Sequence, residues 1–130
     1  MKVQIMALVL LLFSMSCTAD DSWLEQQAFL TTSKVKTLFG NAKFEKEKFR
    51  TGSNLQRGEM AASLLLLKPY IGADFAKVIE DLGPVTGHFW ADWIPAYLID
   101  SPKIKQQKWQ LVFLLSKDRK VSDIRVHKNG

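Results

Sequence analysis

The side chains in this sequence that most often do chemistry are few and far apart. The two histidines, His88 and His127, are widely separated, and the only cysteine, Cys17, lies near the N-terminus. Zinc-type metal sites need Cys and His ligands at close, regular spacings. The sequence therefore predicts no metal site.

Several carboxylates could in principle supply an acid and a base, since two well-placed carboxyl groups suffice for glycoside hydrolysis. Asp74 stands directly before an apolar helical pattern, which favours an N-cap, and Glu80 and Asp81 fall on the solvent face of that helix. The chain has no Gly-x-Ser-x-Gly, phosphate-loop or dinucleotide-binding motif. We therefore expect no catalytic residues and no cofactor. Two carboxylates with raised pKa values in a deep pocket would indicate otherwise, the candidates being Asp74, Glu80, Asp81, Asp92 and Asp100.

Aromatic residues are concentrated in residues 89–97, Phe-Trp-Ala-Asp-Trp-Ile-Pro-Ala-Tyr. On a strand, Phe89 and Trp93 would face one side and Trp90 the other, because successive side chains point to opposite faces. A proline then breaks the strand, which would turn Tyr97 onto a new edge. Packing of all these rings in the core is the alternative. Exposed Trp and Tyr are frequent interface anchors, so the sequence predicts a partner-binding surface made by Trp90, Trp93 and Tyr97.

Cys17 lies at the end of a segment with the three-part plan of a secretory signal. Lys2 gives a positive start, residues 5–13 give an apolar run, and small residues follow. The run is too short to span a membrane, which takes about 20 apolar residues. We therefore expect residues 1–16 to be a signal peptide and residues 17–21 to be a polar tether.

The placement of Cys17 directly after Ser-Met-Ser resembles the lipobox of bacterial lipoproteins, with the small Ser16 at the last position before the cut. In that family the cysteine thiol is diacylated and becomes the mature N-terminus, so the resemblance implies lipidation of Cys17. Cleavage after Ser16 or Ala19, with Cys17 removed or left as a free thiol, is the alternative. A single cysteine forms no internal disulfide, so stability must come from the apolar core.

The next part of the chain has a helical pattern followed by an irregular one. Apolar residues spaced through 22–40 predict a helix that is interrupted at residues 31–33. The charged stretch 41–52 is expected to be extended or irregular, with the rings of Phe44 and Phe49 inserted into the body of the domain.

Two helices with clear start signals follow. Ser53 or Asn54 caps the first, which Pro69 ends, and Asp74 caps the second, which ends at a Gly-Pro pair. Their expected buried stripes are Met60, Leu64, Leu65 and Leu67 in the first helix and Phe75, Val78, Ile79 and Leu82 in the second.

Beyond these helices the pattern changes to strands. The expected strands cover residues 88–93, 96–99, 109–115 and 121–127, the last two joined by a polar hairpin loop. Leu111 or Phe113 is expected to face the helices. Helices followed by an antiparallel meander define an α+β class, with N-terminal helices packed on one face of a small antiparallel sheet in an ααβββ-like order. Residues 22–130 are expected to form a single domain.

The charge of the chain is only mildly positive. Removing Lys2 from the 18 basic residues leaves 17 against 13 acidic residues, or a net charge of +4, and the two signs are interleaved, as in Lys-Phe-Glu-Lys-Glu-Lys at 43–48. This bias could favour anionic lipid headgroups or acidic proteins. An exported protein seldom meets nucleic acid, so nucleic-acid partners are not expected. We also expect the protein to be a monomer.

A family resemblance follows from several short motifs. Gly-Ala-Asp-Phe-Ala-Lys-Val at 72–78 and Leu-Gly-Pro at 82–84, before aromatic strands and a polar hairpin, resemble the small bacterial envelope lipoproteins of the SmpA/OmlA (BamE) type. Related lipoproteins also carry a segment like Phe44 to Phe49 and an Arg-Gly-x-Met helix, here residues 57–60. The likeness covers roughly residues 44–126. It implies an ααβββ fold and a binding role, because known members are non-enzymatic partners in outer-membrane protein assembly and the same architecture serves in secreted inhibitors of β-lactamase.

The sequence as a whole predicts a lipid-anchored envelope protein that acts as a scaffold or accessory protein-binding module in outer-membrane assembly or maintenance. Because Thr18 rather than Asp follows Cys17, it is expected on the outer membrane, facing the periplasm and bound to other envelope proteins. A soluble periplasmic, inhibitor-like binding protein is the alternative, and a small envelope enzyme is the third.

Overall fold

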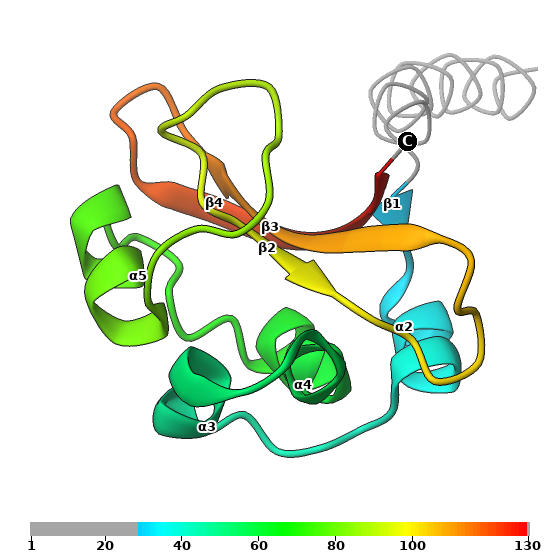
Figure 1. Cartoon of the computed structure of the whole chain (residues 1–130). Coiled ribbons are helices and arrows are strands. Elements are labelled where there is room, and N and C mark those ends of the chain that lie inside the picture. Colours follow the sequence, from blue (N-terminus) through cyan, green and yellow to red (C-terminus); the bar gives the residue numbers. More distant parts are fainter. Residues whose placement is uncertain (1–28, 130) are drawn as a thin grey trace, which may run out of the picture.

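Four helices cover one face of a four-stranded antiparallel sheet in the order β1-β4-β3-β2, as the computed structural model of residues 29–129 shows (Figure 1). The elements, in chain order, are β1 (Phe29–Leu30), α2 (Thr32–Phe39), α3 (Lys46–Thr51), α4 (Asn54–Leu67), α5 (Phe75–Leu82), β2 (Ala96–Ile99), β3 (Lys108–Leu115) and β4 (Val121–Asn129).

The α+β class and the helices on one sheet face are confirmed. The order differs from ααβββ, because a short strand precedes the helices and there are four helices among these residues. The predicted signal peptide, the tether and Cys17 lie outside the described residues.

Side-chain caps fix the starts of the two helices that the sequence predicted most clearly. The Ser53 hydroxyl accepts a hydrogen bond from the Gln56 amide, and the Gln56 side-chain oxygen accepts one from the Ser53 amide, which completes a capping box at α4. The Asp74 carboxylate accepts the Lys77 amide at the start of α5. These polar groups satisfy amides that have no partner within the helix, so both helices begin where the sequence predicted.

The prediction for residues 22–40 is wrong in part. Phe29 and Leu30 form a strand that pairs with His127 and Val126 of β4, and the helix begins only after Thr31, whose hydroxyl caps it. Pairing with a strand that is distant in the sequence overrides the local helical pattern, because an open sheet edge offers unused backbone hydrogen bonds. Residues 22–28 lie outside the described residues.

Residues 41–52 also differ from the prediction, because their second half forms the short helix α3. Phe49 is fully buried as predicted, and Phe44 is half-buried against it, with ring centroids 6.2 Å apart. The ring of Phe49 also packs edge-on against Tyr97 of the sheet, at 5.4 Å. The apolar ring rather than the charged neighbours therefore decides how this segment packs.

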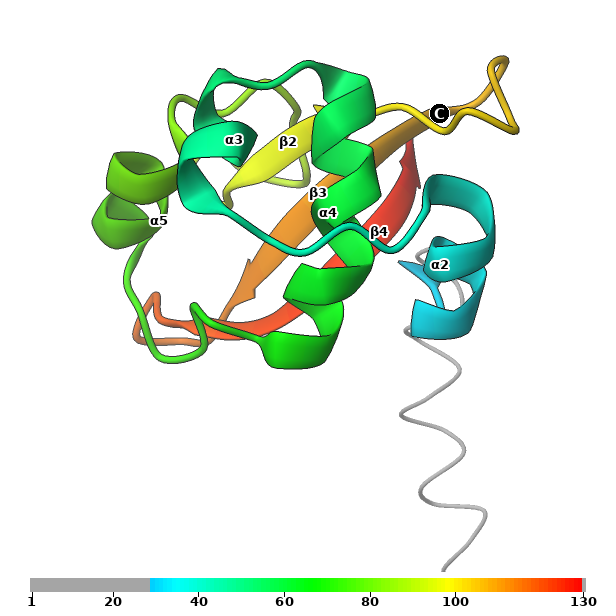
Figure 2. The same cartoon turned by 90° about the horizontal axis from the view of Figure 1, so that it is seen from below.

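Helix α4 lies across the sheet with α2 on one side and α3 on the other (Figure 2). Because it is covered on several sides, it is buried through most of its length, from Arg57 to Leu65. Leu67 departs from the predicted stripe and is exposed, since it belongs to the last turn, just before Lys68 takes a left-handed conformation and the chain turns at Pro69.

The Arg-Gly-x-Met stretch of α4 holds neighbouring segments together. Arg57 is buried and donates to the backbone carbonyls of Phe49 (2.8 Å) and Arg50 (3.0 Å) at the end of α3. A Cβ on Gly58 would lie 2.5 Å from the carbonyl oxygen of Asp100, so only glycine lets the chain after β2 approach the helix this closely. Both residues therefore have a packing role.

Both faces of the sheet carry apolar residues. Leu111 and Phe113 of β3 are fully buried on the helical side, in one cluster with Leu64, Val78 and Leu82, which confirms the predicted inward face. The alternate residues belong to a second, smaller cluster on the other face, composed of Phe89, Ala96 and Val112 with Phe29, Ile94 and Leu114 packed against it. The second face is thus covered by the segment that contains Phe89 and Ile94, which is not helical.

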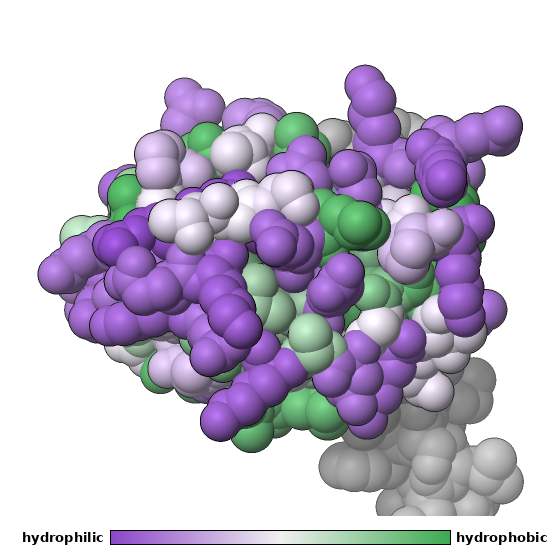
Figure 3. All heavy atoms as spheres, turned by 60° about the horizontal axis from the view of Figure 1, so that its bottom comes forward, coloured by the Kyte–Doolittle hydropathy of each residue, from purple (hydrophilic) through white to green (hydrophobic). Residues whose placement is uncertain are grey.

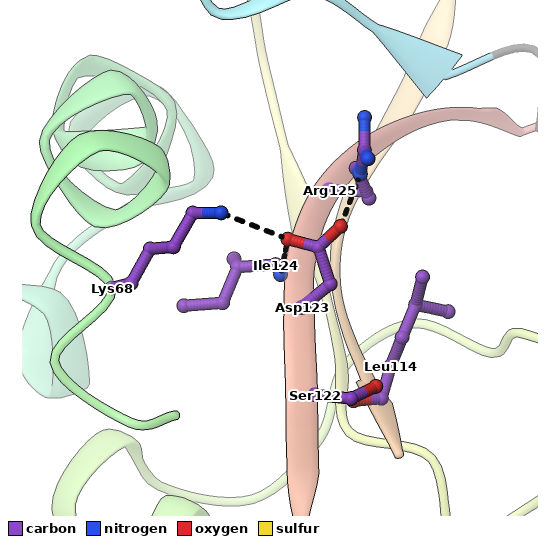
Figure 4. Close-up of polar contacts among 6 residues, drawn as sticks. All are labelled: Lys68, Leu114, Ser122, Asp123, Ile124 and Arg125. Atoms are coloured by element: carbon purple, nitrogen blue, oxygen red, sulfur yellow. Dashed lines mark hydrogen bonds and ion pairs between the residues drawn. The ribbon is translucent and has the colours of Figure 1, made fainter. Parts of the chain in front are cut away.

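Three features occupy the edge of β4 that does not pair with β3. Backbone hydrogen bonds join Val121 to Gly72 and Ala73 at one end, and β1 pairs with the other end. Between them the Asp123 carboxylate accepts the Ile124 amide at 2.9 Å and contacts Arg125 at 2.7 Å and Lys68 at 3.6 Å (Figure 4). Charged groups and occupied amides along an edge disfavour pairing with another chain.

Candidate functional site

The loop of residues 84–95, which we call the aromatic loop, lies over the sheet face opposite the helices (Figure 1). Backbone hydrogen bonds fix it at both ends. The amides of Thr86 and Gly87 donate to the Ala96 carbonyl, and the Phe113 amide donates to the Pro95 carbonyl at 2.9 Å. The loop therefore forms the second layer over the sheet, which the sequence did not predict.

Trp90 is held at the tip of the aromatic loop in an unusual backbone conformation. Its φ is +63°, and the Ala91 amide donates to the Phe89 carbonyl across it at 2.7 Å. This turn buries Phe89 against the sheet and leaves Trp90 71% exposed. The predicted strand over residues 88–93 is therefore wrong, because the left-handed residue reverses the chain. Such a conformation costs a non-glycine residue about 1–3 kcal/mol, and residues held in it cluster at functional sites.

Trp93 is the second exposed indole of the loop, at 49% exposure. The guanidinium carbon of Arg119 lies 5.0 Å from the centroid of its ring. Arg119 belongs to the turn between β3 and β4 and also has a positive φ, of 62°, with its amide bonded to the Ser116 carbonyl. Arg119 was not predicted, because nothing in the local sequence indicates that this hairpin and the aromatic loop lie side by side.

Tyr97 does not belong to this surface. Its side chain is fully buried, its ring packs edge-on against Phe49 and Phe113, and its hydroxyl donates to the Gly83 carbonyl at 2.8 Å. Burial raises the pKa of its hydroxyl. The prediction of Tyr97 as a surface anchor is therefore wrong, because the residue lies within β2 and its side chain points to the helical face. The prediction that at least one of the three aromatic residues is exposed is confirmed by Trp90 and Trp93.

A buried glutamine ties the aromatic loop to the sheet. Gln110 of β3 has no exposed surface, and its amide group bonds to both the N–H (3.1 Å) and the carbonyl (2.9 Å) of His88. Its side-chain nitrogen also lies 3.1 Å from Nδ1 of His127. Because that nitrogen can only donate, His127 accepts through Nδ1 and is neutral. The His127 ring packs against Phe89 at 4.9 Å and Phe29 at 5.8 Å, and burial lowers its pKa.

We expect the stability of the domain to fall as the pH drops below about 6.5, the ordinary histidine pKa. The pKa of His127 is lower in the folded chain than in the unfolded chain, so the unfolded chain binds the proton first. The stabilisation by the neutral imidazole is complete above about pH 6.5 and is lost progressively as the pH falls toward the pKa of the folded chain. One group contributes at most about 1.4 kcal/mol per pH unit. Urea unfolding at several pH values measures this, with His127→Phe as the control in which the decline is reduced. An equal decline in both proteins would contradict this role of His127.

The carboxylates considered as acid or base have other contacts. Asp74 caps α5, and Asp81 accepts hydrogen bonds from Tyr70 (3.0 Å) and contacts Lys77 (3.1 Å). Although burial opposes ionisation, these contacts hold the pKa of Asp81 below its usual value. Asp81 is thus less solvent-facing than predicted. Asp92 is fully exposed beside His88, at 3.5 Å.

One of the predicted carboxylates, Asp100, lines hollows of the described surface. Asp100 lines two of these hollows, in each of which it is the only carboxylate among the lining residues. The hollow that holds two carboxylates is lined by Glu45 and Glu59, and a hydrogen bond from Lys48 lowers the pKa of Glu45. Within residues 29–129, no group of His, Cys, Asp and Glu side chains has metal-binding geometry.

Residues 29–129 form a small α+β domain whose aromatic loop exposes the indoles of Trp90 and Trp93, with Arg119 against the ring of Trp93. No family model, curated protein or solved structure matched the chain. Among the helices of residues 29–129, none is long and apolar enough to cross a membrane. The similarity to the SmpA/OmlA (BamE) type therefore remains a prediction from the sequence motifs.

Proposed function

We propose that this protein is a non-enzymatic, lipid-anchored accessory module of the cell envelope that binds another envelope protein through Trp90 and Trp93. The observation that carries the proposal is the conformation of Trp90, whose backbone is held in the left-handed region while 71% of the residue remains in water. An unfavourable backbone conformation that presents a large indole to solvent is costly for stability alone. Trp is also among the residues that contribute most to binding at protein interfaces.

The way in which the loop is built also supports a binding role. Phe89 is buried beneath the tip, Gln110 fixes His88, and backbone bonds fix both ends of the loop to the sheet. A surface that is already ordered loses less conformational entropy when a partner binds. The opposite, helical face shows apolar and polar side chains interspersed on the side visible in Figure 3. Leu66 and Leu67 at the end of α4 are exposed apolar residues.

Cross-linking in intact cells tests the proposed contact. A photo-reactive phenylalanine analogue placed at Trp90 is expected to capture one discrete envelope protein. The same analogue at Leu67, which is similarly exposed on the helical side, is the matched control and is not expected to capture it. An envelope partner recovered in the membrane fraction supports the accessory role, whereas a soluble enzyme would favour the inhibitor-like alternative. Identical products from both positions would contradict the proposed contact.

The lipid anchor is tested separately by metabolic labelling with a fatty-acid analogue. We expect the wild-type protein to be labelled and Cys17→Ala to lose the label, because the thiol of Cys17 is the proposed acceptor. Multiple acylation is expected, since a single acyl chain binds a membrane only marginally. Unlabelled wild-type protein in the soluble periplasm would contradict the anchor.

A further inference from the structure

Some charged side chains of the β3–β4 hairpin beside the aromatic loop have a polar partner, and others do not. In the hairpin loop, Lys120 lies 3.5 Å from Asp74, and the Asp118 carboxylate is bonded by the Ser116 hydroxyl, which lowers the pKa of Asp118. Arg119 lies over the ring of Trp93, and within residues 29–129 no carboxylate lies within ion-pair distance of it. Arg119 is therefore a cation of this surface that is not neutralised by the described part of the chain.

The position of Arg119 suits the recognition of a carboxylate. A guanidinium is planar, and when one face lies over an indole its N–H edge remains available for two parallel hydrogen bonds to a carboxylate. The exposed part of the Trp93 ring supplies apolar surface beside that edge, and Trp90 exposes a second indole in the same loop. Arg119 and Trp93 thus combine one cationic group with an apolar ring, and Trp90 adds an exposed indole to the same loop.

We propose that this surface, formed by Trp90, Trp93 and Arg119, binds an acidic segment of the partner protein, in which a carboxylate pairs with Arg119 and a neighbouring apolar side chain packs on the indoles. This inference rests on the proposed function and specifies the chemistry of the partner. The mild net charge of +4 expected once Lys2 is removed with the signal favours an acidic partner in the same way.

A protein segment fits this surface better than an anionic lipid surface. Lipid headgroups are typically recognised by clusters of about four to eight Lys and Arg residues. Here the cations of the hairpin that have no carboxylate partner among the described residues are Arg119 and Lys117, and the fully exposed Asp92 lies in the aromatic loop itself. One guanidinium is enough to bind one carboxylate of a peptide, whereas a membrane surface dense in phosphates needs more cations than this surface has.

A displayed library of random linear peptides tests the inference, selected on the purified full-length protein and counter-selected on the double variant Trp90→Ala/Trp93→Ala. We expect the enriched peptides to share an Asp or Glu next to an apolar or aromatic residue. A synthetic peptide of that sequence should bind about tenfold more weakly to Arg119→Gln, and more weakly at high salt, because a charge-assisted bond is lost or screened. Lys105→Gln, which removes the same charge from an exposed loop at the other end of β3, should bind as the wild type does.

The possible failures separate this inference from the proposed function. Peptides that need both indoles but carry no acidic residue, and bind Arg119→Gln unchanged, would overturn the acidic partner and leave the indole contact standing. A selection in which no peptide depends on the indoles would overturn both. Binding of the wild type, but not of Arg119→Gln, to vesicles of phosphatidylethanolamine and phosphatidylglycerol would identify a lipid surface and overturn the inference as well.

Discussion

Replacing Phe113 with alanine is expected to destabilise the domain by about 3–5 kcal/mol, the usual cost of deleting a buried phenyl ring. Phe113 is fully buried at the centre of β3, where its ring lies 6.0 Å from the rings of both Tyr70 and Tyr97. Its loss leaves a cavity between the sheet and the helices that these large neighbours cannot fill. Urea unfolding followed by circular dichroism measures the change in the free energy of unfolding.

Two further variants keep this test informative. A domain of this size has only about 5–15 kcal/mol of stability, so Phe113→Ala removes a large part of it, whereas Phe113→Leu retains most of the volume and should lose less. Leu114→Ala changes the next residue on the opposite, partly exposed face and is expected to lose less than Phe113→Ala. Equal losses at positions 113 and 114 would contradict the assignment of the inward face.

The sequence predicted best those elements whose signals are local. The caps of α4 and α5 depend on residues within a few positions of one another, and both are confirmed. Leu111 and Phe113 face the helices as expected, and they do so together because strand alternation places residues two apart on the same face.

The errors arise where contacts distant in the sequence decide the structure. Phe29 joins a strand only because β4 is beside it, and residues 88–93 form a turn because Phe89 packs on the sheet while Trp90 reverses the chain. The aromatic composition of this segment is typical of a strand, and nothing local indicates that an indole takes a positive φ. Tyr97 was misplaced for the same reason, since its orientation depends on the register of β2 against β3.

The supporting residues of the candidate site could not have been found from local patterns. Gln110 lies in an apolar strand, and its bonds reach His88 and His127, which are far from it in the sequence. Arg119 looks like any charged residue of a hairpin loop until the fold brings it over Trp93. The sequence showed only the concentration of aromatic residues. That signal identified which segment carries the candidate site, but it did not indicate how the segment folds.

The second large effect is expected on binding. Trp90→Ala/Trp93→Ala should weaken the affinity for the captured envelope partner by at least about 30-fold, since a loss of about 2 kcal/mol or more is typical of a central Trp anchor. The melting temperature should change little, because Trp90 is largely exposed, Trp93 is about half exposed, and Phe89 and Gln110 still hold the loop. Removal of the left-handed Trp90 leaves an alanine with the same backbone constraint, so no strain is relieved.

The most direct test of the account is the dissociation constant of the purified partner for three forms of the protein, measured beside their melting temperatures. The wild type and Leu66→Ala/Leu67→Ala, which alters an exposed apolar pair on the helical side, should bind equally well. Trp90→Ala/Trp93→Ala should melt nearly as the wild type does and lose at least about 30-fold in affinity. Unchanged affinity in the tryptophan variant, or an equal loss in the leucine variant, would contradict the claim that the aromatic loop is the binding surface.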